Sequence, residues 1–313
     1  MKNKNKIISV IAIIVLVLII WIGEGFLVAG EGEGDLEIHF IDVGQGDSIL
    51  IKEEDEFMLI DGGKRADGDT VVKYLKEQNV ESLKYVIGTH PHEDHIGGLK
   101  KVVDRFQIEN VIMPDITHNT KVFEDVLDSV INKGLSIIVG RAGDKYSLKD
   151  ADILFLAPNG DKYSSINDYS ISIKIEYGKT SFLFPGDAEK TSENEMIENY
   201  SKSLKSDVLK LGHHGSNTST TEDFLNEVNP SIGVISVGKD NKYNHPNKDI
   251  LERLDEKDIK VFRTDVDGDI IIKSDKSNII LQDGSSINGV TDSILREISK
   301  VKDRLIDNLI EDI

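Results

Sequence analysis

The sequence Thr89-His90-Pro91-His92-Glu93-Asp94-His95 places three imidazoles and two carboxylates within seven consecutive residues. It follows the apolar run Tyr85 to Ile87 after one residue, Gly88, and this run has the length and composition of a short strand. Ordinary core packing cannot satisfy so many polar side chains at the end of a buried strand, because each one needs a hydrogen-bond partner or a counter-charge. We therefore predict that this segment binds a cation.

The spacing within this segment predicts two metal ions. In a tight loop, residues two apart can point the same way, so His90 and His92 would share one ion while Asp94 and His95 turn toward a second. Imidazole and carboxylate ligands together suit Zn, Mn or Fe. The chain contains no cysteine, so no thiolate ligand is available to narrow the choice.

Two later segments supply further candidate ligands at strand ends. Phe184-Pro185-Gly186-Asp187 ends an apolar strand in a Gly-Asp corner, which suits a carboxylate that bridges two metal ions. Leu211 to Ser216 ends another strand and contains His213 and His214. One of this adjacent pair would bind metal and the other substrate, and the residues alone leave open which does which.

Short apolar strands and helix-like stretches alternate in both halves of the chain. The first half contains candidate strands at 36–42, 48–52, 57–60, 85–87, 110–113 and 136–139, and candidate helices at 69–78, 98–106 and 121–133. The second half contains candidate strands at 153–156, 170–177, 181–184, 208–211, 269–272 and 278–281, with a candidate helix at 188–200. Between the strand at 208–211 and the strand at 269–272, a helix, a strand, a second helix and a second strand are expected to follow through Phe262. Hairpin strands followed by helices predict an α/β fold of two face-to-face sheets between outer helices, a four-layer αββα sandwich.

The charge balance restricts the partners of the chain. Its 313 residues include 56 acidic and 37 basic side chains, for a formal net charge of -19. Tight, sequence-independent binding of duplex DNA needs Lys and Arg to replace counterions, so this balance argues against it. A phosphodiester substrate remains compatible, because two divalent cations can supply local positive charge.

The N-terminus has the pattern of a membrane anchor. Lys2, Lys4 and Lys6 precede the apolar run Ile7 to Ile22, in which Ser9 is the only polar residue. The positive-inside rule predicts a cytoplasmic N-terminus and an extracytoplasmic body. A retained transmembrane helix is favoured over a cleaved signal peptide, which would release the body as a secreted protein, because no A-x-A cleavage pattern is present.

The C-terminus has the pattern of an amphipathic helix, with apolar residues three or four apart at Ile294, Ile298, Val301, Leu305 and Leu309. It would pack on the surface of its own domain or pair two copies as a homodimer. We therefore predict an anchor and linker at 1–30, a catalytic body at 31–283 and a C-terminal helix at 284–313.

The ordered motifs resemble those of the metallo-β-lactamase superfamily, and within it the hydrolase domain of ComEC-like competence proteins and the phosphorylcholine esterases. The motifs that carry the resemblance are Asp42-Val43-Gly44-Gln45-Gly46-Asp47-Ser48, Thr89 to Gly98, Asn167-Asp168-Tyr169-Ser170, Pro185-Gly186-Asp187, Lys210 to Ser216 and Asn241 to Pro246. They run from about Leu36 to Ile272, which is nearly the whole body.

This resemblance implies a role for each ligand. It implies His90 and His92 on the first metal, Asp94 and His95 on the second, Asp187 as the bridge, and His213 or His214 completing the second site. Asp61 would orient a ligand histidine. We expect two divalent ions, with Zn favoured and Mn as the alternative. Two departures stand out, since the stretch Asn167 to Ser170 offers no third histidine to the first metal, and the chain lacks a multi-helix channel.

Several polar residues near these motifs are weaker candidates. Those expected to support ligands or bind substrate are Gln45, Asp47, Asn167, Ser170 and Ser216. His245, before Pro246 in a polar loop, is a candidate for substrate binding or proton transfer, with a surface turn as the alternative. His39 on a strand and His118 in a loop are expected to be structural.

These features predict a hydrolase that uses a metal-bridging hydroxide on phosphodiesters, a nuclease or phosphodiesterase that acts on single-stranded nucleic acid or a small diester. Asp94 would accept the proton of the attacking water, and His214 or His245 would protonate the leaving oxygen. The alternatives are a hydrolase of other esters or amides, such as phosphorylcholine esters or lactams, and a non-catalytic binding module.

Overall fold

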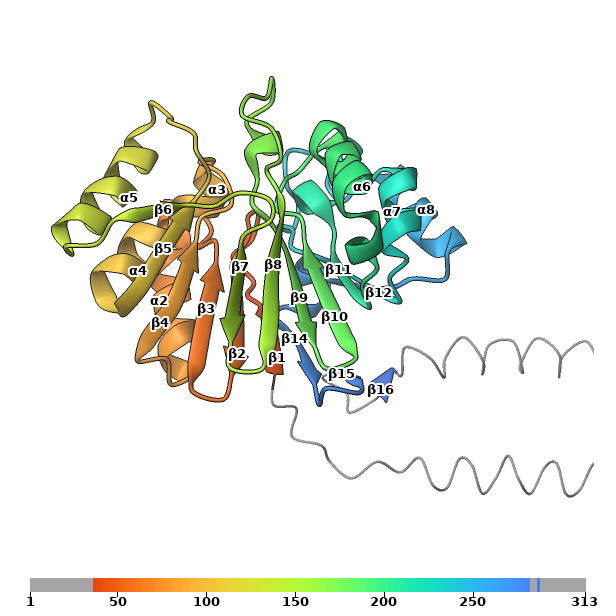
Figure 1. Cartoon of the computed structure of the whole chain (residues 1–313), viewed down its shortest axis with the longest axis horizontal. Coiled ribbons are helices and arrows are strands. Elements are labelled where there is room, and N and C mark those ends of the chain that lie inside the picture. Colours follow the sequence, from red (N-terminus) through yellow and green to blue (C-terminus); the bar gives the residue numbers. More distant parts are fainter. Residues whose placement is uncertain (1–35, 282–285, 288–313) are drawn as a thin grey trace, which may run out of the picture. The chain divides into compact units, whose positions relative to one another are not determined.

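A computed structural model describes residues 36–281 and 286–287, which form two mixed β-sheets (Figure 1). The first sheet has the strand order β16 (Ser286–Ile287), β15 (Ile279–Leu281), β14 (Ile270–Ser274), β1 (Leu36–Phe40), β2 (Ile49–Glu53), β3 (Glu56–Ile60), β4 (Ser82–Ile87), β5 (Gln107–Met113) and β6 (Ile137–Val139). The second has the order β13 (Lys260–Arg263), β12 (Ile232–Ile235), β11 (Val208–Lys210), β10 (Thr180–Phe184), β9 (Ser172–Tyr177), β8 (Ala151–Ala157) and β7 (Lys145–Leu148).

Amphipathic helices cover the outer face of each sheet (Figure 1). The first sheet carries α2 (Gly68–Glu77), α4 (Leu99–Arg105) and α5 (Lys121–Asn132), and the second carries α6 (Lys190–Leu204), α7 (Glu222–Val228) and α8 (Lys248–Glu256). The shorter elements are α3 (Glu93–Ile96), α9 (Thr264–Asp267) and the 3-10 turns η1 (Arg65–Asp67), η2 (Asn167–Tyr169) and η3 (Gly212–Gly215). In α2, for example, Val71, Val72 and Leu75 fall on one buried face because of the 3.6-residue period.

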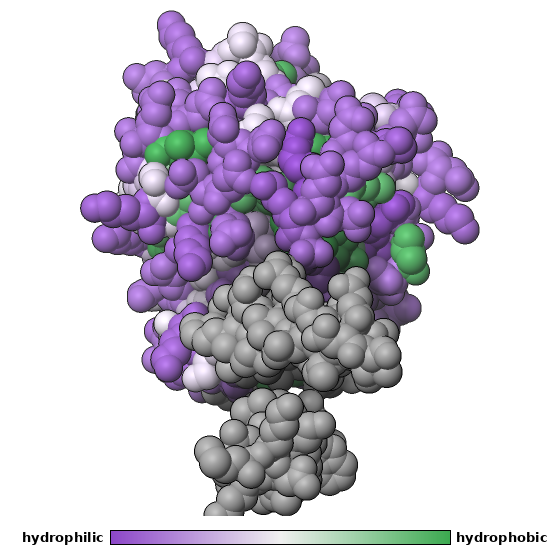
Figure 2. Space-filling view, turned by 90° about the vertical axis from the view of Figure 1, so that its right-hand side faces the viewer, coloured by the Kyte–Doolittle hydropathy of each residue, from purple (hydrophilic) through white to green (hydrophobic). Residues whose placement is uncertain are grey.

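Three apolar clusters separate the layers. The central cluster contains side chains from both sheets, such as Ile38 and Phe40 of β1 with Phe155 of β8 and Phe184 of β10. The other two clusters lie between each sheet and its helices. The predicted αββα sandwich is therefore confirmed for the described residues. The outer surface on the α6 to α8 side is mostly hydrophilic, with apolar side chains in small separate patches (Figure 2).

Two of the differences from the sequence prediction have a clear physical reason. Strand β7 was not predicted, because only Leu148 of its four residues is fully buried and its sequence, Lys-Tyr-Ser-Leu, carries a weak apolar signal. The helix predicted at 188–200 begins at Lys190 and ends at Leu204. Asp168 Oδ1 accepts from the backbone N–H groups of Glu189 and Ser192, at 3.0 and 3.2 Å, and this cap sets the later start.

The predicted terminal segments lie outside the described residues. These are the N-terminal anchor and linker at 1–30, the C-terminal amphipathic helix at 284–313, and both boundaries of the body. None of the helices within 36–281 has the length and apolar character needed to cross a membrane.

The parallel strands bring the predicted ligand segments to one edge of the sandwich. In the first sheet β3, β4 and β5 run parallel, and in the second β10, β11 and β12 do. The carboxyl ends of parallel neighbours lie at the same sheet edge, so the loops after β3, β4, β10 and β11 converge. This edge is the top of the view in Figure 1, where α3 lies.

Glycines allow the loop after β4 to approach the loop after β3. Gly62 N–H donates to His95 O at 2.7 Å, and Gly98 N–H donates to Gly63 O at 3.0 Å. A Cβ on Gly98 would collide with the carbonyl group of Gly62. The residue at position 98 must therefore be glycine for steric reasons, although its φ of -79° is open to any residue.

We expect Gly98→Ala to lower the free energy of unfolding by about 3 kcal/mol, because backbone atoms on both sides cannot move aside. Urea unfolding followed by circular dichroism measures this change. Gly134→Ala is the matched control, since Gly134 has a φ of +74° and nothing within 4 Å of the added Cβ. It should cost only about 1 kcal/mol, and equal losses in both variants would contradict the steric explanation.

Candidate metal centre

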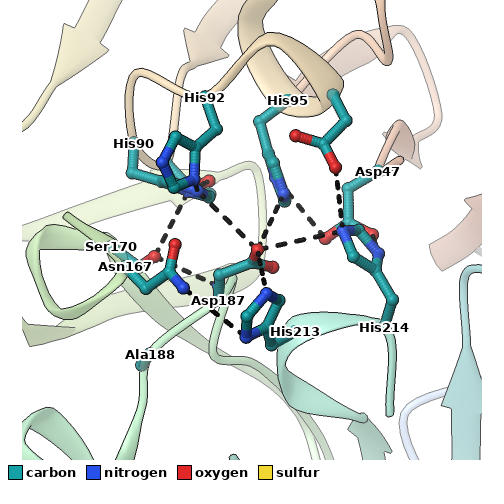
Figure 3. A network of polar contacts seen from close by, with 12 residues as sticks. Asp47, His90, His92, His95, Asn167, Ser170, Asp187, Ala188, His213 and His214 are labelled. Atoms are coloured by element: carbon teal, nitrogen blue, oxygen red, sulfur yellow. Dashed lines mark hydrogen bonds and ion pairs between the residues drawn. The ribbon is translucent and has the colours of Figure 1, made fainter. Parts of the chain in front are cut away.

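A buried carboxylate lies at the centre of the converging loops. Asp187, 2% exposed, follows the corner at the end of β10. Its Oδ2 lies 3.2 Å from His95 Nε2, 3.7 Å from His90 Nε2, 3.7 Å from His213 Nε2 and 3.8 Å from His214 Nε2. Figure 3 shows these rings directed at Asp187 from opposite sides. Histidines from the loops after β4 and β11 thus meet at one carboxylate from the end of β10.

His90 and His92 form one ligand group with Asp187. His90 Nε2 lies 2.9 Å from His92 Nδ1, and one atom from each of the three residues lies within 4.8 Å of the others. The second nitrogen of His90, Nδ1, contacts Ser170 Oγ at 3.3 Å and Thr89 Oγ1 at 3.1 Å. Ser170 Oγ also accepts from the backbone N–H of Asp187 at 3.1 Å, so it links two members of the group.

Asp94, His95 and His214 form a second group, whose ligand atoms also lie within 4.8 Å of one another. His214 Nε2 lies 3.5 Å from Asp94 Oδ2. His214 Nδ1 donates to the carbonyl oxygen of Ser236 at 3.0 Å, which leaves Nε2 as the atom with a free lone pair. The two groups flank Asp187 on either side.

Asp61 orients the ring of His95 through a hydrogen bond to Nδ1, the nitrogen that faces away from Asp187. Its Oδ2 accepts from His95 Nδ1 at 2.8 Å and from Thr89 Oγ1 at 2.7 Å, and its Oδ1 accepts from the Thr89 N–H at 2.8 Å. Asp61 is fully buried, and burial raises the pKa of its carboxyl against the opposing effect of His95. These bonds direct His95 Nε2 toward Asp187.

Asp47 forms a buried ion pair with Lys210. Asp47 Oδ2 lies 2.7 Å from Lys210 Nζ, and both side chains are 1% exposed. Asp47 also lies 3.3 Å from His214 Nδ1 and 3.8 Å from His95 Nδ1. Burial opposes its charge, but Lys210 and His214 hold the pKa of Asp47 at about 2. Lys210 received no role from the sequence, although a lysine inside the apolar run Val208 to Leu211 is the signal that marks it.

The electrostatics of the centre favour positive charge. Burial alone would keep His95 and His214 neutral, yet the carboxylates raise the pKa of His95 well above its usual range and that of His214 to about 9. Asp187 contributes the largest share of this effect at both rings. A divalent cation would supply the same charge to the same carboxylates.

Unpaired buried atoms test whether these residues fit a metal. His95 Nε2, His214 Nε2 and Asp187 Oδ1 are buried and have no hydrogen-bond partner in the described residues. Leaving such atoms unpaired costs roughly 1–3 kcal/mol each. Imidazole nitrogens and carboxylate oxygens directed at common points are a donor set suited to Zn or Mn. The residues therefore fit divalent ions.

His213 and His214 diverge although they are adjacent. Both have left-handed backbone conformations, with φ of 49° and 56°. Residues other than glycine rarely adopt this conformation, which costs about 1–3 kcal/mol and is concentrated at functional sites. His214 is buried within the second group, whereas the side chain of His213 is 23% exposed. His213 Nδ1 lies 3.2 Å from Thr218 Oγ1 and 3.5 Å from Asn167 Nδ2.

His245 lies beside His213, with ring centroids 5.6 Å apart. Burial, with the neighbouring His213 and His214, lowers the pKa of His245 to about 4. It is therefore a neutral imidazole near pH 7. Its Nδ1 is buried and has no hydrogen-bond partner in the described part of the chain.

The other residues singled out from the sequence belong to neither ligand group. Gln45 Oε1 accepts from Gly238 N–H at 3.2 Å, joining the turn after β1 to the loop after β12. Ser216 Oγ lies 3.0 Å from Thr218 Oγ1, which contacts His213 Nδ1, and the Ser216 N–H donates to His213 O at 2.9 Å. His39 contacts Tyr74 and Glu37, and His118 contacts Thr120. Glu189, which sequence reasoning missed, accepts from Asn167 Nδ2 and Thr218 Oγ1.

Comparison with known proteins identifies the family. The model of the metallo-beta-lactamase superfamily matches residues 41–239. The chain therefore belongs to this superfamily, whose fold and strand-end histidines the structure displays.

Its relatives include competence proteins. The chain is 32% identical to ComE operon protein 3 of Bacillus subtilis over 252 residues, and 30% identical to Competence protein ComA of Neisseria gonorrhoeae over 237 residues. Each match covers 75% of this chain and 32% of the relative, so the chain spans about a third of their length. Among solved structures, the metallo hydrolase Igni18 of Ignicoccus hospitalis has a TM-score of 0.50 at 16% identity, covering 75% of this chain and 98% of that one. This likeness shows the shared fold.

We expect Lys210→Met to lower the free energy of unfolding by about 3–5 kcal/mol, because it leaves the Asp47 carboxylate buried without its ammonium partner. Chemical denaturation measures this change. Lys84→Met is the matched control, since its 2.7 Å pair with Glu56 is 25% and 30% exposed; it should cost about 1 kcal/mol or less. Similar losses of stability in both variants would contradict the expectation that breaking the buried pair costs more than breaking a partly exposed one.

We expect close to two equivalents of divalent transition metal per chain, and about one or fewer after Asp187→Asn, because the Asp187 carboxylate lies between both groups. Inductively coupled plasma mass spectrometry gives the metal content. Asp207→Asn is the control, since Asp207 accepts from Ser181 at the opposite end of β10 and should leave the content unchanged. Wild-type protein prepared without chelator that holds no metal, and takes none up, would overturn this expectation.

Proposed function

We propose that this chain is a metal-dependent phosphodiesterase that uses water as its nucleophile, with single-stranded nucleic acid or a small diester as substrate. The observation that carries the proposal is the meeting of two histidine and carboxylate groups at Asp187, in a buried centre where some nitrogen and oxygen atoms have no hydrogen-bond partner among the described residues. Such paired sites are suited to stabilising both oxygens of an in-line displacement at phosphorus.

The geometry favours a particular division of the ligands. His90, His92 and Asp187 would hold one ion, and Asp94, His95 and His214 the other, with Asp187 contacting both groups. Zn is the favoured metal and Mn the alternative. Two such ions would lower the pKa of a water and neutralise charge on the phosphate.

The serines near the centre do not offer a nucleophile. Ser48 and Ser170 are fully buried, and Ser216 is 4% exposed. Ser48 Oγ donates to the backbone of Asp61, and Ser170 Oγ is held between His90 and Asp187. A substrate cannot reach these hydroxyls, which supports direct attack by water.

The chain's own residues supply the proton steps. Asp94, whose side chain is 26% exposed, is the ligand carboxylate most open to solvent and is placed to accept the proton of the attacking water. His214 lies within a ligand group, so His245 is the remaining candidate at the leaving oxygen. As a neutral imidazole it would stabilise the charge on that oxygen by donating an N–H hydrogen bond, and the proton that the oxygen finally takes up would come from solvent.

Two observations favour phosphodiesters over other esters and over lactams. A relative that matches three quarters of the chain is named Competence protein ComA, which fits a nucleic-acid phosphodiester. The centre also combines clustered carboxylates for cations with nearby lysines, Lys64, Lys239 and Lys242, around a cavity of about 560 Å³ that reaches Asp94. A substrate with several negative charges matches this arrangement.

We expect the full-length chain, supplied with Mn or Zn, to hydrolyse bis-p-nitrophenyl phosphate, and His92→Ala to reduce the rate by at least about a hundredfold, because a ligand of the first group is removed. Release of p-nitrophenolate measures the rate. His118→Ala is the control, since this ring lies 6.4 Å from that of His92 and belongs to neither group; it should retain the activity.

Two results would argue against the proposal. Hydrolysis of a lactam or carboxylic ester, with none of any phosphodiester, would favour the alternative hydrolase class. Equal rates for wild type and His92→Ala would indicate a contaminant or a different site.

A further inference from the structure

The loop between β12 and α8 lies beside the metal centre, since Ser236 O accepts from His214 Nδ1 and the ring of His245 lies next to that of His213. The side chain of Asn241 stabilises the conformation of this loop through hydrogen bonds to its backbone. Its Oδ1 accepts from the N–H groups of Tyr243 and His245 at 3.1 and 3.0 Å, and its Nδ2 donates to the carbonyl oxygens of Gly238 and His245 at 2.9 and 2.6 Å. Gln45 ties the base of the loop to the turn after β1. The loop is therefore pre-organised, and ordering it on binding costs little.

Three neighbouring rings connect the tip of this loop with the centre. Tyr243 stacks on His245, with centroids 5.8 Å apart and planes 27° apart. His245 meets His213 edge-on at 5.6 Å, and His213 Nε2 lies 3.7 Å from Asp187 Oδ2. Tyr243 is nevertheless 51% exposed, and it is one of the few large apolar side chains in the described residues with such exposure. An exposed aromatic ring is thus linked to the central carboxylate through two histidine rings.

Lysines surround this ring in a chain whose net charge is -19. Lys64, Lys239 and Lys242 line the cavity of about 560 Å³, which is also lined by Tyr243 and by the carboxylates of Glu93 and Asp94. Within residues 36–281 the ammonium groups of Lys64, Lys239 and Lys242 form no ion pair with a carboxylate, whereas many other lysines do. Positive charge is therefore available at this rim in a protein that carries an excess of negative charge elsewhere.

We propose that Tyr243 is a stacking platform for a nucleobase next to the phosphodiester at the metal centre, and that Lys64, Lys239 and Lys242 bind the phosphates of the same single strand. This inference rests on the phosphodiesterase activity proposed above and narrows its substrate to one that carries bases. An aromatic ring flanked by cations is the usual means by which proteins hold unpaired strands. A duplex would keep its bases stacked on one another and out of reach of Tyr243.

The ammonium of Lys242 does not block the platform. It lies 5.0 Å from the centroid of the Tyr243 ring, on an exposed side chain. A cation over an exposed ring contributes about two- to fivefold in an equilibrium constant. Stacking of a base on an aromatic ring contributes about 5- to 150-fold in affinity. A base therefore displaces the ammonium, which becomes available to a phosphate.

The test compares the binding of two strands of equal length. One is fluorescein-labelled oligothymidylate, and the other carries the same phosphodiester backbone with abasic tetrahydrofuran residues. Fluorescence anisotropy in the His92→Ala background keeps the strands uncut. We expect Tyr243→Ala to weaken binding of oligothymidylate about tenfold or more and to leave binding of the abasic strand unchanged. Tyr243→Phe should bind both strands like the parent, because it keeps the ring.

Substitution of the lysines, unlike that of Tyr243, should weaken binding whether or not the strand carries bases. Lys64→Ala and Lys239→Ala should weaken both strands alike and reduce the slope of log affinity against log salt by about 0.7 for each phosphate that the variant no longer binds. Lys248→Ala is the matched control, since this exposed lysine pairs with Glu252 on α8 and should change neither strand. In the wild-type background, Tyr243→Ala should raise KM for oligothymidylate with little effect on kcat.

The outcomes separate this inference from the proposed function. Equal affinity of Tyr243→Ala and its parent for oligothymidylate would overturn the platform while leaving hydrolysis of other diesters in place. Failure of the parent to bind either strand at low salt would overturn it as well. Base-dependent binding through Tyr243 in a wild-type protein that cuts no diester would support the platform and refute the phosphodiesterase.

Discussion

The arrangement of the metal centre depends on one buried carboxylate that is surrounded by imidazoles. Asp187 lies within 3.8 Å of four histidine nitrogens that come from two different loops. Burying this carboxylate is unfavourable unless positive charge is nearby, and bringing several rings together is unfavourable unless they share a cation. Divalent ions would relieve both costs, so the loops after β4, β10 and β11 would gain stability from being held together. The centre is in this sense a structural joint between the two sheets as well as a site for chemistry.

Residues that contact the candidate ligands from outside the centre maintain that geometry. Asp61 and Ser236 accept from the Nδ1 atoms of His95 and His214, which leaves both Nε2 atoms free to face the centre. The buried Asp47 and Lys210 pair balances charge directly beneath His214. Glycines 62 and 98 permit the backbones to approach closely enough for these contacts to form. These buried polar groups therefore orient the ligand nitrogen atoms of His95 and His214 toward the centre.

The chain as a whole is negatively charged, whereas divalent ions would make the candidate metal centre locally positive. Its net charge of -19 repels long polyanions, while the clustered carboxylates of the centre would hold these divalent ions. The lysines and Tyr243 at the rim add attraction only over a short distance, since exposed charges are screened beyond roughly 10 Å at ordinary salt. Such a chain would discriminate by local fit, favouring a strand that can enter the rim over one that must lie along the surface.

The sequence by itself determined the layered fold and the ligand types, because apolar periodicity and strand-end His and Asp clusters are local signals. Residues 89–95, Asp187 and the adjacent pair at 213 and 214 could be singled out without coordinates, whereas the choice within that pair could not. Their separation follows from left-handed backbone at both positions and from Ser236 and Asp47, which are distant in sequence. Lys210 received no role, and the contact of Gln45 with the loop after β12 was not predicted, because their partners Asp47 and Gly238 are distant in sequence. Only the tertiary structure placed Tyr243 beside His245 and Lys64 across the cavity, because through-space contacts between separate loops leave no periodic trace in the chain.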